Sequence, residues 1–181
     1  MITERIAIEL ASHEAIVQEA YKDSVGVWTW GIGVTDASGH KVSRYIDKPS
    51  TIERCFEVYE WLLREKYLPG VRRAFGDHEL SEHELGAALS FHYNTGAIGR
   101  ATWVKQFLGG DIGAARASFM AYRQPKEIIP RRKKERDLFF DRKWSNDGTA
   151  LLIPVRKPSY LPDFRNARRI DIQDDVRRVL G

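Results

Sequence analysis

Three residues near the N-terminus carry side chains suited to cleaving a glycosidic bond: Glu14, Asp23 and Thr29. Such cleavage needs two carboxyl groups in different environments. One stays protonated and donates to the leaving oxygen. The other stays ionised and stabilises positive charge on the sugar, attacks as a nucleophile or activates water. A hydroxyl group such as that of Thr29 can hold the attacking water.

The spacing of these three residues is weak support by itself. Glu14 could simply be a charge at a helix end, Asp23 a turn residue and Thr29 a strand residue. On spacing alone, that plainer interpretation is favoured. The surrounding elements therefore decide whether the three side chains can meet.

The elements predicted around them bring a helix end to a sheet edge. Residues 3–13 read as a short amphipathic helix with Thr3 as its N-cap, and Glu14 follows directly. Residues 20–46 are rich in Val, Trp, Thr, Tyr and Gly, with turns at Gly26 and at Ser38-Gly39. We expect two or three short antiparallel strands there. A helix end that meets a sheet edge makes a natural cleft wall.

The rest of the chain reads mainly as helices. Capping boxes at Ser50/Glu53 and Ser81/Glu84 begin two of them, and Pro130 suits the first position of another. The sequence predicts an α+β protein, with a small antiparallel β lobe at about 20–46 beside a larger helical lobe. Three prolines interrupt the last forty residues, so we expect this extension to pack on the helical lobe.

Composition indicates the size of the domain, its charge and the compartment in which the protein folds. Its 181 residues suit one domain, which can be divided into two lobes, and its net charge of +4 draws it to anionic polymers. Cys55 is the only cysteine, which predicts folding in a reducing compartment. The first dozen residues lack the apolar core of a secretory signal.

The segment 14–35, EAIVQEAYKDSVGVWTWGIGVT, resembles the active-site segment of phage-type lysozymes, the endolysins of glycoside hydrolase family 24. That family shows a Glu, then an aromatic, a basic residue and Asp, then Gly, an aromatic, Thr and a Gly-x-Gly turn. In this chain the pattern is Glu14, Tyr21-Lys22-Asp23, Gly26, Trp28-Thr29 and Gly31-Ile32-Gly33. One departure is Val34, where most members have His.

Three later segments extend the resemblance. Residues 91–97 look like the helix end that lines the sugar cleft, 107–111 like a turn before the next helix, and 130–136 like an Arg-Arg-x-x-Glu helix. The resemblance therefore makes 1–141 the catalytic domain and leaves 142–181 as a C-terminal extension.

The resemblance also implies residue roles. Glu14 inherits the role of general acid, Asp23 lies across the scissile bond, and Thr29 positions water. An Arg near the start of the late helix pairs with the acid, for which Arg132 is the first candidate and Arg131 the second.

Sugar contacts are predicted at five further residues. They are Trp30, His92, Asn94, Thr95 and Trp103. Trp103 could equally fill the core.

The expected activity is hydrolysis of the β-1,4 bond between N-acetylmuramic acid and N-acetylglucosamine in peptidoglycan, with no cofactor. We expect a monomer without stable membrane insertion, held in the host cytoplasm until a holin pore releases it to the cell wall. The basic run 131–136 could indicate nucleic-acid binding, but the resemblance favours a helix face with buried arginines.

Two rival functions remain open. One is a lysozyme fold kept as a non-catalytic wall-binding or scaffolding module. The other is a zinc amidase, for which His78 and His83 are poorly placed ligands because they do not share a helix face well.

Overall fold

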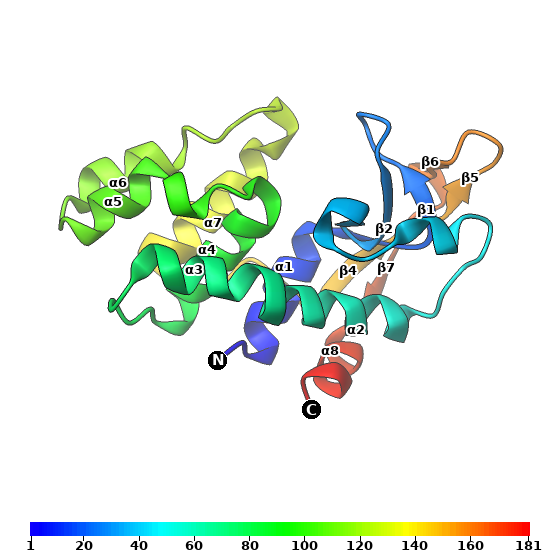
Figure 1. Ribbon diagram of the computed structural model, residues 1–181, viewed down its shortest axis with the longest axis horizontal. Helices are drawn as coiled ribbons and strands as arrows, with labels where there is room; N and C mark the ends of the chain where they lie inside the picture. The colour runs from blue at the N-terminus through cyan, green and yellow to red at the C-terminus, as the bar shows by residue number, and fades with distance from the viewer. The chain divides into compact units, whose positions relative to one another are not determined.

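The N-terminal helix α1 (Glu4–His13) forms as predicted. The hydroxyl of Thr3 accepts a hydrogen bond from the backbone N–H of Ile6 at 3.3 Å, as expected of its N-cap. The computed structural model describes residues 1–181 and divides into two compact units (Figure 1). The first comprises 1–6 and 63–145, and the second comprises 7–62 and 146–181.

A five-stranded sheet organises the second unit, in the strand order β3-β2-β1-β4-β7. Its strands are β1 (Ala15–Lys22), β2 (Trp28–Ile32), β3 (Val34–Thr35), β4 (Thr149–Leu152) and β7 (Arg168–Asp171). Strands β1 and β2 are antiparallel, with Val17 opposite Gly31 and Tyr21 opposite Thr29. Between these pairs β1 carries more residues than β2, so the register shifts and β1 must bend.

The C-terminal extension belongs to this sheet, which corrects the prediction that it packs on the helical lobe. Strand β4 pairs in parallel with β1 and antiparallel with β7. The extension also forms a small hairpin of β5 (Val155–Arg156) and β6 (Leu161–Pro162), and the helix α8 (Gln173–Leu180), which packs on α2 (Ile52–Leu62). Figure 1 shows β4 and β7 beside the blue β1. Pro154 precedes β5, Pro158 lies in the turn after it and Pro162 ends β6, and both strands are too short for a sequence pattern to reveal.

A buried carboxylate anchors the start of the extension. Glu9 is fully buried in α1, and its Oε2 accepts hydrogen bonds from Asn146, from the backbone N–H at 3.0 Å and from Nδ2 at 2.6 Å. The Nε2 of His13 lies 3.4 Å from the other oxygen of Glu9. Because a buried charge without partners is costly, these contacts tie 146 firmly to the unit.

The first unit is helical. Its elements are the π-helical turn η3 (Leu63–Tyr67) and the helices α3 (Leu68–Phe75), α4 (Glu82–Thr95), α5 (Thr102–Leu108), α6 (Ile112–Phe119) and α7 (Ile129–Asp141). The predicted capping box of Ser81 and Glu84 starts α4. In the second unit, Thr51 rather than Ser50 caps α2, since its hydroxyl accepts the Arg54 N–H at 3.0 Å. No helix in the chain has the length and apolar character of a bilayer span.

We predict that Ile172→Ala lowers the free energy of unfolding by about 2–5 kcal/mol, the usual cost of truncating a buried Ile. Ile172 is fully buried at the start of α8, and its N–H donates to the carbonyl of Gly148 at 3.0 Å. Urea denaturation measures the effect. The control is Leu151→Ala, in a side chain that is 37% exposed on β4. Equal, small costs for both variants would contradict the integration of the extension into the unit.

Candidate active site

Glu14 lies between the end of α1 and the start of β1, as the sequence predicts. Its backbone N–H donates to the carbonyl of Ala11 at 3.1 Å, which closes the last turn of the helix. The residue is half-buried. The chain therefore changes from helix to strand at Glu14. The helix before it and the strand after it fix the position of its backbone.

Asp23 occupies the turn between β1 and β2. Its Oδ1 accepts the backbone N–H groups of Val25 at 3.0 Å and Val27 at 2.8 Å. Its own N–H donates to the carbonyl of Val27 at 3.0 Å. The turn passes through Gly26 at φ +81°, a conformation that favours glycine. One carboxylate oxygen thus holds the turn, and these bonds leave Oδ2 uninvolved.

Thr29 lies on β2 and is only 4% exposed. Its hydroxyl donates to the carbonyl of Val27 at 3.2 Å. Asp23 and Thr29 are therefore linked through one residue, because the carboxylate accepts the N–H of Val27 while the hydroxyl donates to its carbonyl.

Tyr21, near the end of β1, is influenced by both carboxyl groups. Burial raises the pKa of its phenol, and the negative charges of Glu14 and Asp23 raise it further. Both carboxylates consequently lie within electrostatic range of one side chain, and Thr29 is its partner across the β1–β2 pair. Tyr21 therefore lies opposite one predicted residue and within electrostatic range of the other two. Sequence reasoning recorded Tyr21 only as an aromatic in the motif, and missed this position.

Trp30 is a core residue, which corrects the prediction of a sugar contact. Its side chain is fully buried, and its ring stacks on that of Tyr45 with centroids 3.7 Å apart. The indole N–H lies within hydrogen-bond distance of the carbonyl of Gln18 at 3.0 Å and of the hydroxyl of Ser50 at 3.2 Å. Val34, which replaces the usual His, is also fully buried and lies opposite Trp30.

Trp103 lies in the core of the first unit. Of the two roles considered from the sequence, a sugar contact or a core position, the core position is therefore the correct one. Trp103 is fully buried, and its ring centroid lies 5.4 Å from that of Phe91, 4.6 Å from Phe119 and 5.0 Å from Phe139. A side chain so enclosed has no face left for a sugar ring.

His92 is half-buried in α4. Burial lowers the pKa of its imidazole, which favours the neutral ring. The ring meets the edge of Tyr67 with centroids 5.3 Å apart. A Cβ at Gly70 would come within 2.5 Å of His92 Nε2, so the glycine leaves room for the imidazole. Its contact with sugar remains a prediction.

Asn94, Thr95 and Arg132 meet at a hollow of about 470 Å³ in the first unit. The Oδ1 of Asn94 accepts a hydrogen bond from Arg132 Nη2 at 2.5 Å. The hydroxyl of Thr95 donates to the carbonyl of Phe91 at 2.7 Å and accepts the N–H of Ala97 at 3.1 Å. The structure therefore brings these three predicted residues together, with Asn94 exposed at the surface.

Glu135 accepts hydrogen bonds from both Arg131 and Arg132, the two arginines predicted to pair with Glu14. The Nε of Arg131 donates to its Oε1 at 2.9 Å, Arg132 Nη1 donates to its Oε2, and the hydroxyl of Ser90 donates to Oε1 at 2.5 Å. All four residues are buried. Burial lowers the pKa of Arg132, and Glu135 opposes that change. Pairing of Arg132 or Arg131 with Glu14 stays a prediction.

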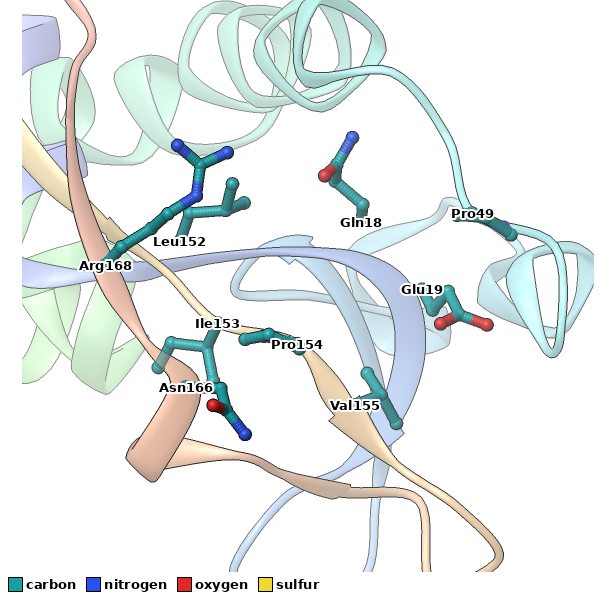
Figure 2. A pocket seen from close by; sticks show the side chains of 9 residues that line it. All are labelled: Gln18, Glu19, Pro49, Leu152, Ile153, Pro154, Val155, Asn166 and Arg168. Atoms are coloured by element: carbon teal, nitrogen blue, oxygen red, sulfur yellow. The ribbon is translucent and has the colours of Figure 1, made fainter.

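A further hollow, of about 310 Å³, lies along β1 and contains none of the predicted site residues. Figure 2 shows Gln18 and Glu19 of β1 with residues of the C-terminal extension around it. Gln18 Nε2 donates to the carbonyl of Ser50 at 2.7 Å, and Glu19 pairs with Lys157 at 3.2 Å. These polar groups are engaged in structure, so we assign them no catalytic role.

The helical unit, the sheet unit and the carboxylates around Tyr21 define a lysozyme-like α+β protein. The sequence profile of the phage lysozyme family matches residues 11–135. The chain therefore belongs to the phage lysozyme family and is an enzyme of the lysozyme type, as the resemblance predicted. No curated protein sequence matches it.

Solved structures share the fold. An endolysin from Escherichia coli O157:H7 phage FAHEc1 is 22% identical, with a TM-score of 0.70 over 81% of this chain and 97% of its own. A mutant P22 lysozyme is 24% identical, with a TM-score of 0.61 over 77% and 97%. The muramidase domain of SpmX from Asticaccaulis excentricus is 22% identical, with a TM-score of 0.60 over 77% and 97%. These likenesses confirm the predicted lysozyme-like architecture.

We predict that Glu135→Gln costs about 3–5 kcal/mol of stability, because it removes the buried negative charge with which Arg131 and Arg132 both pair. The same change at the exposed Glu127 is the matched control and should be nearly neutral. Denaturant titration compares the two variants. Similar midpoints would show that the Arg131–Glu135–Arg132 cluster does not hold the first unit together.

Proposed function

We propose that the chain is an endolysin that hydrolyses the β-1,4 bond between N-acetylmuramic acid and N-acetylglucosamine in peptidoglycan. Glu14 donates a proton to the leaving oxygen, Asp23 faces the developing positive charge as the ionised partner, and Thr29 holds the attacking water. The observation that carries this proposal is the placement of the three groups: Glu14 lies where α1 passes into β1, and Asp23 and Thr29 at the other end of β1 are both hydrogen-bonded to Val27.

The hydrogen bonds of Asp23 and Thr29 support this division of labour. Two amide N–H groups donate to Asp23 Oδ1, which suits the acceptor chemistry of an ionised carboxylate. Thr29 donates its hydroxyl proton to Val27, so the lone pairs of its oxygen can accept a hydrogen bond from water. A water held there could be aimed at the sugar beside Asp23.

The setting of the reaction is proposed from charge and composition. The net charge of +4 favours binding to an anionic wall polymer. We propose that the enzyme acts as a monomer, because Glu14, Asp23 and Thr29 come from one chain. We also propose that it stays in the host cytoplasm until a holin pore admits it to the wall, where it causes lysis.

We predict that Glu14→Gln lowers the rate of reducing-end release from purified peptidoglycan by about 10²- to 10⁴-fold, the usual contribution of a general acid. The variant should retain the circular dichroism and unfolding midpoint of the parent. The control is Glu65→Gln, at an exposed position in η3, which should keep normal activity.

Mass spectrometry of the digest identifies the bond that is cut. Fragments that end in reducing N-acetylmuramic acid support the proposal. Near-normal activity of Glu14→Gln contradicts the mechanism. Binding to peptidoglycan by the parent without any release of reducing ends would indicate a wall-binding module, and free amino groups in place of reducing ends would indicate an amidase.

We predict that Thr29→Val lowers kcat by at least about tenfold, whereas Thr29→Ser retains most activity. Valine keeps the shape of the side chain but removes the oxygen that would hold water, while serine keeps the oxygen. Steady-state hydrolysis of solubilised glycan strands measures both. Equal losses in the two variants would assign the role of Thr29 to packing in β2.

A further inference from the structure

A hollow of about 400 Å³ in the second unit has Asp23 in its wall. One side is formed by β1 and the turn after it, and includes Tyr21. The other side comes from the C-terminal extension and includes Leu161, Phe164 and Arg156. The extension lies outside the family match, which ends at 135. This chain therefore has a cavity next to a proposed catalytic carboxylate that the matched segment cannot form alone.

The wall from the extension presents apolar surface and one cation. Phe164 is 70% exposed and Leu161 is 39% exposed. Exposed apolar surface in a concave site is typical of places where a ligand or partner binds. Arg156 is also exposed, and its positive charge acts on the carboxyl group of Asp163. The hollow thus offers contacts for alkyl groups together with a donor for a carboxylate.

The hairpin that carries these residues is fixed to the rest of the unit. The N–H of Lys22 donates to the carbonyl of Tyr160 at 2.8 Å, which joins the hairpin to the end of β1. The hydroxyl of Tyr160 donates to Asp47 at 2.8 Å, and Lys157 forms an ion pair with the same carboxylate. Figure 1 shows β5 and β6 next to β1. The hollow is therefore formed before any ligand arrives, which lowers the entropic cost of binding.

We propose that this hollow binds the stem peptide of the peptidoglycan strand that is being cut, an inference that rests on the proposed function. The substrate carries short peptides on its muramic acid residues, and these peptides present methyl groups and carboxylates. Leu161 and Phe164 match the methyl groups, and Arg156 matches a carboxylate. Because Asp23 belongs to both the hollow and the site of cleavage, a stem next to the scissile bond is the part of the polymer within reach.

The experiment measures binding in the Glu14→Gln background, so that the strands stay intact. The probes are fluorescently labelled glycan strands that carry their stems and the same strands stripped of stems by an amidase. We expect the stem-bearing strands to bind at least about tenfold more tightly. Leu161→Ser combined with Phe164→Ser should remove this preference, bringing the Kd of stem-bearing strands to that of stripped strands.

Single-site variants separate the hollow from general effects of the extension. Arg156→Gln, at an exposed side chain, should reduce the preference by a fewfold without changing the unfolding midpoint. The matched controls are Leu151→Ser, on the exposed face of β4, and Arg165→Gln, on the exposed 3₁₀ turn η6 (Phe164–Asn166). Neither residue lines the hollow, so both controls should keep the full preference.

A preference that survives the Leu161 and Phe164 substitutions overturns the inference. An equal loss of affinity for both kinds of strand also overturns it, because the substituted residues would then contact the glycan and not the stem peptide. The proposed function fails separately, if the enzyme with Glu14 intact releases no reducing ends from either substrate.

Discussion

The bend in β1 is the constraint on which the active site depends. Glu14 precedes this strand and Asp23 follows it, and an eight-residue strand that stayed straight would span about 26 Å. Two carboxyl groups so far apart could not act on one glycosidic bond. The shift in register between Val17 and Tyr21 inserts extra residues into β1, which bends it. Tyr21 follows this shift and is affected by both carboxylates.

Buried carboxylates stabilise each unit in the same way. Glu9 in the second unit and Glu135 in the first are both fully buried, and each accepts several hydrogen bonds. Ionised groups are expensive to bury without partners, so each fixes the segments that supply its donors. Glu9 fixes the start of the extension through Asn146, and Glu135 fixes α4 to α7 through Ser90. Neither carboxylate belongs to the proposed chemistry, and each joins segments of its own unit.

Much of the fold and of the candidate site could be predicted, because those signals are local. The capped helix before Glu14 and the ordered motif around Asp23 and Thr29 lie within a short stretch of sequence. The sugar contact predicted for Trp30 was wrong, and for Trp103 the alternative of a core position was the correct one. A large aromatic suits a sugar cleft and a core equally well, and only burial distinguishes them. The position of Tyr21 depends on a bend that arises from strand register, which residue types do not reveal.

The extension was misplaced for a different reason: its strands have two to four residues, and their partners lie far away in the sequence. The position of the extension beside β1 indicates what it contributes to the fold. The matched segment ends before β4, and without β4 the backbone groups at that edge of β1 would lack strand partners. Pairing with β4 closes the edge at Ala15 and Ile16, and the chain then continues into the hairpin that reaches the other end of β1. One segment therefore pairs with the strand that the proposed catalytic residues flank and brings apolar side chains beside Asp23.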